Sequence, residues 1–341
     1  VKICTIHLER RDLAKAEAAL KEGQRWFAQA PNPEVGALLT AESGVLSAYK
    51  GDLKQASSTL KLALDEARAA RLSDTEAHVL GNLGIVELRL RDYPTALKHL
   101  EGAAEICHTL GSLRHEGRHR FNMAYLLMHL GNLAEALQQL LRARQLFERT
   151  DWQQGLQAVL INLLRLSWLM GENEEARHIA TRLQVVLPGA PPPILCEYYW
   201  NLGELSLREG AWQLAVGEFG NCLELAEEKD LPFWRQQALE GRSEARLRQG
   251  ELGKAKADSQ AAMDLFESVE EQVEWPCRSW HRRSLILDAL GDLKSAEEAM
   301  RRAVAIIEEI ADSVPEGPLR SMSSQGLSWR ASILEQIENQ T

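Results

Sequence analysis

The pattern with the clearest chemical precedent is His115-Glu116-Gly117-Arg118-His119, which fits the H-E-x-x-H signature of zinc proteases. In those enzymes the motif lies within an apolar helix, and a third ligand follows downstream. Here the motif contains a glycine, and Arg114, Arg118 and Arg120 would repel a dication. Neither a further metal-ligand spacing, nor a G-x-S-x-G elbow, nor a phosphate-binding glycine loop is found. We therefore expect no metal, no cofactor and no enzymatic activity.

A second pattern is an asparagine nine residues before a recurring turn, at Asn82, Asn122, Asn162 and Asn201. An asparagine side chain has one acceptor oxygen and two N–H donors, which match the N–H and C=O groups of a peptide unit. Asparagine is a mediocre helix former, so four in register within predicted helices need a reason. A row of them can hold the backbone of an extended chain without reading its sequence. The alternative is that they bond to a neighbouring helix end or face water.

Residues three and seven positions after each asparagine, and four before it, share its helix face. The basic and aromatic ones are His78, Arg89, Arg118, Tyr125, His129, Arg165 and Arg208. Arginine binds carboxylates through two parallel hydrogen bonds, so this face favours an acidic partner. Trp168 and Trp200 offer anchor surfaces. The alternatives are a solvated face of mixed charge and, for the tryptophans, internal packing.

The elements that position these residues are helix pairs, each joined by a turn that recurs every 39 to 41 residues. The turns begin at Arg11, Gly51, Arg91, Gly131, Gly171, Gly210, Gly250 and Gly291. Their sixth position is alanine all eight times, where only a methyl group lets two helices approach closely. The glycine suits the left-handed residue that ends a helix, and the Asp or Asn after it suits an N-cap. The sequence therefore predicts an all-α repeat protein.

The connections between helix pairs carry their own signals. Ser73 and Glu76 have the S-x-x-E spacing of a capping box. Only ten residues precede the first turn, about half of what precedes the later ones, so we expect a truncated first helix. The tail leaves the repeat frame. We predict a repeat array over residues 1–311, then a turn and a C-terminal capping helix over residues 312–341 that covers the last exposed seam.

Composition narrows the class of partner. The formal net charge of −10, with basic residues scattered among acidic ones, argues against binding to nucleic acid or to an anionic membrane surface. The apolar runs are too short to cross a bilayer. The five cysteines are far apart and never form a C-x-x-C pair, which favours a reducing, cytoplasmic location.

The frame residues resemble the tetratricopeptide repeat family. Asn82-Leu83-Gly84 and Asn201-Leu202-Gly203 match its helix A, and the turn glycine with the following alanine matches its helix B. Leu164, Ser243 and Ser284 depart from the helix A glycine. The long repeat is similar to kinesin light chains, spindle-orientation adaptors, peptide receptors of Gram-positive bacteria and sensor arms of bacterial signalling ATPases. The resemblance implies a right-handed α-solenoid superhelix of about eight repeats, whose helix A residues line a concave groove where the asparagines grip a peptide backbone.

Two functions follow as hypotheses. In the first, the chain is a scaffold that binds an extended, acidic peptide segment of a partner protein in its groove. In the second, it is the regulatory arm of a larger bacterial ATPase or transcription regulator, with further domains on the same polypeptide. The arm would bind a small effector or hold the catalytic part inactive. The tail residues Pro315-Glu316-Gly317-Pro318-Leu319-Arg320 are similar to the tails of such regulators. A self-associating scaffold is a third possibility.

Overall fold

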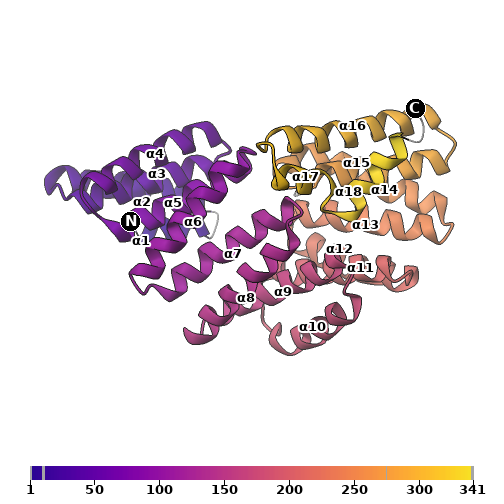
Figure 1. Ribbon diagram of the computed structural model, residues 1–341, viewed down its shortest axis with the longest axis horizontal. Helices are drawn as coiled ribbons and strands as arrows, with labels where there is room; N and C mark the ends of the chain where they lie inside the picture. The colour runs from indigo at the N-terminus through magenta and orange to yellow at the C-terminus, as the bar shows by residue number, and fades with distance from the viewer. Residues whose placement is uncertain (1, 10–11, 274, 339–341) are drawn as a thin grey trace. The chain divides into compact units, whose positions relative to one another are not determined.

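The computed structural model describes residues 2–9, 12–273 and 275–338, and within these ranges it is all-α (Figure 1). The helices are α1 (Lys2–Glu9), α2 (Leu13–Gln29), α3 (Pro33–Tyr49), α4 (Leu53–Ala69), α5 (Ser73–Arg89), α6 (Tyr93–Thr109), α7 (Leu113–His129), α8 (Leu133–Arg149), α9 (Gln153–Met170), α10 (Asn173–Val186), α11 (Pro192–Arg208), α12 (Trp212–Glu228), α13 (Pro232–Arg248), α14 (Leu252–Val269), the 3-10 helix η1 (Glu270–Gln272), α15 (Pro276–Ala289), α16 (Leu293–Asp312), α17 (Pro318–Gln325) and α18 (Ser328–Glu338). Successive helices pack in pairs, which confirms the predicted helix-turn-helix solenoid.

The turns within the pairs have the geometry that the sequence predicts. Their glycines all have positive φ, as at Gly51 (φ +89°) and Gly291 (φ +79°), so each ends its helix in the left-handed region. Arg91 takes the same conformation without being glycine, with φ +64°. Asp52 and Asp292 cap the second helices by accepting backbone N–H bonds three residues on. The first turn residue, Arg11, lies outside the described residues.

The predicted capping box at Ser73 is wrong. Helix α5 already includes Ser73, its N-cap is Leu72, and no side chain caps it. Because Ser73 lies one residue inside the helix, its hydroxyl is past the position from which a cap reaches the free N–H groups. The carboxylate of Glu76 instead accepts a hydrogen bond from Arg68 Nε at 2.7 Å.

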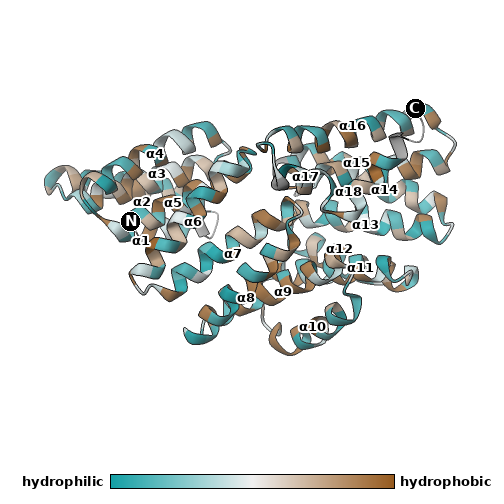
Figure 2. Cartoon of the chain, in the orientation of Figure 1, coloured by the Kyte–Doolittle hydropathy of each residue, from teal (hydrophilic) through white to brown (hydrophobic). Residues whose placement is uncertain are grey.

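The packing of the helix pairs explains why small residues recur at fixed positions of the repeat. The sixth-position alanines are buried, most of them completely. Opposite them, a Cβ on Gly84 of α5 would meet Leu100 Cγ of α6 at only 2.5 Å, so glycine is required for this approach. Figure 2 shows hydrophilic and hydrophobic residues on the same helices, as helices with one buried face require. All five cysteines are buried and free, and none of the described helices is long and apolar enough to cross a membrane.

The helices form two compact units. Unit 1 comprises the chain up to Leu126 together with Leu141–Trp152, and unit 2 comprises Leu127–Leu140 and the chain from Gln153 onward. In unit 2 the first helices of the pairs lie next to one another in the order α9, α11, α13 and α15. After α16, the helices α17 and α18 fold back and pack against it, with Leu327 and Ile333 buried (Figure 1). Two helices therefore follow the array where one capping helix was predicted.

Candidate functional site

In unit 1, α5 and α7 together present a polar face. The two helices are in contact where the His119 ring covers Gly81, since a Cβ on that glycine would meet His119 Cε1 at 2.3 Å. Asn82 is half-buried, and its Nδ2 lies 3.2 Å from His78 Nε2 in the preceding turn. Asn122 and Tyr125 on α7 are also half-buried. These side chains keep part of their surface accessible on a face that belongs to first helices of the repeat.

Arg118 supplies the charge of this face. It is exposed, whereas His119 is buried, and burial followed by the positive charge of Arg118 lowers the pKa of His119 to about 3. Burial and Arg118 also lower the pKa of His78 and His115. The three imidazoles are therefore neutral at pH 7, and a ligand meets a guanidinium among uncharged donors and acceptors.

The H-E-x-x-H residues do not form a metal site. The buried Glu116 accepts a hydrogen bond from Arg120 Nε at 2.7 Å, and its other oxygen lies 3.2 Å from His108 Nδ1. His115 Nδ1 faces the Ser112 hydroxyl at 2.9 Å. Among the described residues, no group of three or more potential ligands could hold a metal ion.

Arg89, at the end of α5, is exposed and donates from Nη1 to the carbonyl of Ala48 at 2.9 Å. This bond ties the last turn of α5 to the neighbouring α3. The guanidinium thus has a structural contact besides the role in ligand binding predicted for it.

In unit 2, the asparagines are placed differently from the prediction. Asn201 is fully buried; its Nδ2 donates to the carbonyl of Glu197 at 2.8 Å, and its Oδ1 accepts from Trp168 Nε1 at 2.9 Å. Asn162 is also buried and donates to the carbonyl of Ala158 at 3.0 Å. Neither amide bonds to a neighbouring helix end or faces water: both donate to the preceding turn of their own helix, and the oxygen of Asn201 also accepts from the Trp168 indole.

The arginines and tryptophans of unit 2 stack on each other. Trp168 and Trp200 are buried at 0% and 4% exposure, with ring centroids 6.1 Å apart, so they pack internally in this structure. Arg165 is buried and bonds to Glu197 at 2.9 Å. Arg208 is exposed, and its guanidinium lies 5.2 Å from the Trp168 ring centroid. His129 of α7, the last predicted site residue, is buried.

A buried ionic cluster was missed by the sequence analysis. Arg282 of α15 bonds to Glu204 of α11 at 2.9 Å and to Glu240 and Glu244 of α13 at 3.2 and 2.7 Å. Burial alone would lower the pKa of Arg282, but the three carboxylates together raise it above its usual value. The sequence signal for this cluster was the position of its residues in the repeat: Arg282 occupies the place that asparagine has in other repeats, and Glu204 follows Asn201 by three residues.

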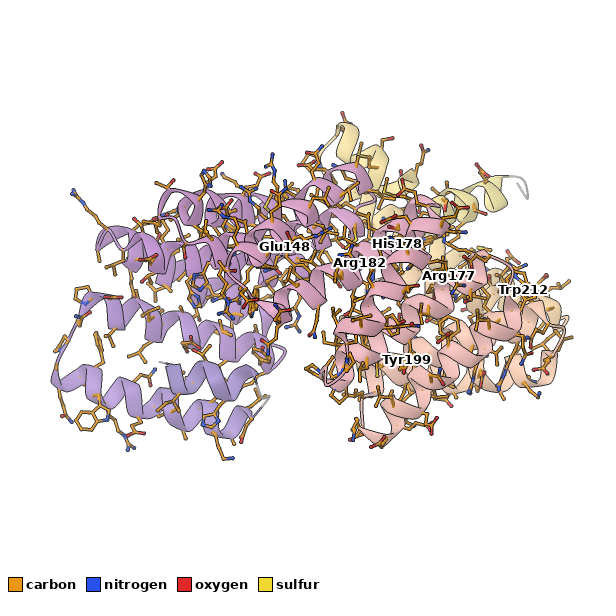
Figure 3. The ribbon with its side chains drawn as sticks, turned by 90° about the horizontal axis from the view of Figure 1, so that it is seen from below. Glu148, Arg177, His178, Arg182, Tyr199 and Trp212 are labelled. Carbon is orange, nitrogen blue, oxygen red and sulfur yellow. The ribbon has the colours of Figure 1, made fainter. Side chains whose placement is uncertain are left out.

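The outer helices carry basic residues that the repeat frame does not select. Arg177, His178 and Arg182 lie along α10 (Figure 3), and the last two are exposed. Arg177 donates to the Ser206 hydroxyl and to a Glu209 carboxylate oxygen, both at 3.1 Å, and so joins α10 to the end of α11. The charge of Arg177 is therefore already paired inside the repeat array.

Comparison with known families agrees with this architecture. Two models described as tetratricopeptide repeat match residues 75–147 and 278–309, one in each half of the chain. The chain contains tetratricopeptide repeats. Both matched segments contain a turn glycine or its equivalent with the buried alanine five positions later, as at Gly131 and Ala136. No curated protein matches the sequence of this chain.

Solved structures share its fold at low sequence identity. A Rap protein complexed with Competence and Sporulation Factor is 13% identical, with a TM-score of 0.67 over 99% of this chain and 97% of that one. NprR in complex with its cognate peptide NprX is 14% identical, with a TM-score of 0.64 over 98% and 97%. A tetratricopeptide repeat protein from Parabacteroides merdae is 19% identical, with a TM-score of 0.54 over 84% and 98%. At these identities the likeness concerns the fold.

Proposed function

We propose that this tetratricopeptide repeat protein is a scaffold that binds an extended, acidic peptide segment on the faces of its first helices. The observation that carries the proposal is the α5–α7 face of unit 1, where the exposed Arg118 stands among half-buried amides and neutral imidazoles. The fold supports it, since two proteins that share this fold over nearly the whole chain were solved in complexes, NprR with its cognate peptide NprX and a Rap protein with Competence and Sporulation Factor.

The chemistry of the face suits a peptide with carboxylates. Asn82 and Asn122 offer amide groups that can pair with a peptide backbone, and Arg118 offers a bidentate contact to a carboxylate. The accessible residues we assign to the contact are thus Asn82, Arg89, Arg118, Asn122 and Tyr125. In unit 2, Asn162 Oδ1 accepts no hydrogen bond from the described residues, but it is buried, so we do not assign it to the contact.

The test is selection from a random peptide library with the full chain as bait, followed by fluorescence anisotropy titration of the selected peptides. We expect enrichment of Asp and Glu, and a Kd raised roughly tenfold or more by Arg118→Ala, because a charge-assisted hydrogen bond contributes about 1.5–3 kcal/mol. Arg142→Ala on α8 is the matched control, since Arg142 is exposed on a second helix. Neutral selected peptides, or equal affinities for both variants, would reject the proposal.

A regulatory role is the second candidate. It is favoured by a further structure of this fold, a Rap conjugation gene regulator in complex with the Phr* peptide, 15% identical with a TM-score of 0.62. In this version the chain is the sensor arm of a larger regulator, and binding of a peptide or small effector changes the state of other domains. Finding a nucleotide-binding or DNA-binding domain on the same polypeptide would favour this role over that of a passive scaffold.

A further inference from the structure

The C-terminal helices α17 and α18, which we call the tail, contact residues far back along unit 2. A Cβ on Gly326, between the two helices, would lie 2.6 Å from the carbonyl oxygen of Gly131, in the turn between α7 and α8. Backbone therefore meets backbone across 195 positions of sequence, and both residues must be glycine for the approach. A helix that only closed the last repeat seam would not need this contact.

Two further contacts place the start of α18 on the first-helix face. The Ser328 hydroxyl lies 3.4 Å from Arg208 Nη2 of α11, and the Trp329 ring packs 5.8 Å from Trp275, centroid to centroid. Arg278 of α15 lies 5.9 Å from the Trp329 ring and 5.8 Å from that of Trp168. We call the residues that receive the tail the seat: Gly131, Arg208, Trp275 and Arg278.

The tail depends on the seat for its order. Its helices have 8 and 11 residues, and isolated helices shorter than about 12–15 residues are marginal in water. A turn joins the tail to α16, and Gly317 in it has φ +140°. The tail can therefore leave the seat by unfolding, and this also gives up its packing against α16.

The tail also leaves the charge of the seat poorly matched. Arg208 keeps part of its surface exposed, but burial of the rest and the neighbouring Arg278 guanidinium lower its pKa and outweigh the opposite effect of Glu204 and Glu244, so two like charges lie close together here. Arg278 has a carboxylate partner in Glu204, whereas the tail gives Arg208 only a hydroxyl at the long distance of 3.4 Å. A carboxylate at the position of Ser328 would form a stronger, charge-assisted bond.

We propose that the tail is a displaceable cover, and that the ligand of unit 2 is a peptide with an aromatic side chain next to a carboxylate, which takes the places of Trp329 and Ser328. The proposal rests on the proposed peptide-binding function and adds its regulation. Because the tail is tethered, it competes with a free ligand for the seat at a local concentration on the order of millimolar. Only a ligand that binds the seat tightly enough to overcome this competition displaces the tail.

The test uses the full chain and two labelled peptides with the sequence of residues 318–338, one of them with Asp in place of Ser328. Gly326→Ala blocks the close approach to Gly131 at a φ of −66° and a ψ of −19° that alanine adopts readily, and its methyl also meets the Met322 carbonyl oxygen of α17 at 2.6 Å, so Trp329→Ala is the variant that tests the seat contact without this local clash. Gly253→Ala is the control, since nothing lies within 4 Å of a Cβ there. Hydrogen exchange of the tail amides and fluorescence anisotropy of the peptides are measured.

We expect Gly326→Ala to speed tail exchange and to bind either peptide roughly tenfold tighter than the wild type, the factor for a seat open about a tenth of the time. The Asp peptide should bind tighter than the Ser peptide, and Arg208→Ala should remove this preference. Trp329→Ala, which leaves Gly131 untouched, should loosen the tail as well. Unchanged exchange in both tail variants, or peptide affinity equal to that of the wild type, would refute the cover. The Arg118→Ala titration tests the proposed function separately in unit 1.

Discussion

Replacing Arg282 by methionine tests whether one buried guanidinium stabilises the three clustered carboxylates of unit 2. Arg282 is 3% exposed and bonds to Glu204, Glu240 and Glu244 on two neighbouring helices. Methionine keeps much of the volume but removes the positive charge, so the buried Glu204 and Glu240 each lose a partner. Breaking a buried ion pair on one side costs about 3–5 kcal/mol, because a charge is left uncompensated.

The contacts that remain place the expected loss at the lower end of this range. Glu204 keeps the Arg278 guanidinium. Glu240 keeps the Ser279 hydroxyl at 2.6 Å and the Gln236 amide at 2.9 Å. The side chain of Glu244 is partly solvated at 20% exposure. We therefore expect Arg282→Met to lower the free energy of unfolding by about 3 kcal/mol at pH 7.

The pH dependence of this loss has a defined sign. Burial raises the pKa of Glu244, but Arg282 and Arg278 outweigh it and hold that pKa below the usual value. In the wild type this carboxylate stabilises the fold above its unfolded pKa, and the contribution is lost as pH falls through the lower folded pKa. Without Arg282, the strongest of the charges that lower this pKa is removed, so the folded pKa rises. The stability gap between wild type and variant should therefore narrow as pH falls from 7 to 5.

Urea unfolding followed by tryptophan fluorescence measures the gap. Arg301→Ala is the control, because Arg301 pairs with Glu297 at 3.6 Å with both side chains more than 60% exposed, and such pairs contribute at most about 1 kcal/mol. Adding Glu240→Gln to Arg282→Met should restore part of the loss, since one uncompensated charge is gone. If Arg282→Met costs no more than Arg301→Ala, or the gap does not change with pH, the cluster is not the desolvated network described above.

Three further predictions concern the packing and titration of the repeats. Gly84→Ala should lower the free energy of unfolding by about 1–3 kcal/mol in urea titrations, because its methyl would overlap Leu100, whereas Gly102→Ala, with its nearest atom at 3.6 Å, should be tolerated. His119 should cost about 2 kcal/mol of stability between pH 7 and pH 5, since its pKa falls from 6.5 to about 3 on folding, and His119→Gln should flatten that part of the stability profile. The five buried thiols should resist a water-soluble thiol reagent in the native chain and react fully in urea; native reaction would show that the pairs open.

The sequence predicts the helix pairs because each signal is local. The glycine, the cap and the small residue act within one turn and are needed at every repeat, so Gly51, Asp52 and Ala56 could be assigned without coordinates. The cluster and the tail contact depend on partners far apart in the chain. Nothing near Gly131 distinguishes it from Gly291, which has the same φ but no atom within 4 Å of its Cβ position.

The asparagine column shows why a repeated position need not have a repeated role. Register places Asn82 and Asn201 at the same point of a first helix, but neighbours decide what each amide meets. Asn82 has a histidine one turn before it and stays half-buried, whereas Trp168 donates its indole N–H to Asn201 and closes it off. A peptide can therefore reach the amide of Asn201 only if Trp168 gives up this bond, and the rings and guanidinium of the tail seat hold Trp168 in place. Contact of a ligand with Asn201 therefore requires a rearrangement of Trp168 that contact with Asn82 does not.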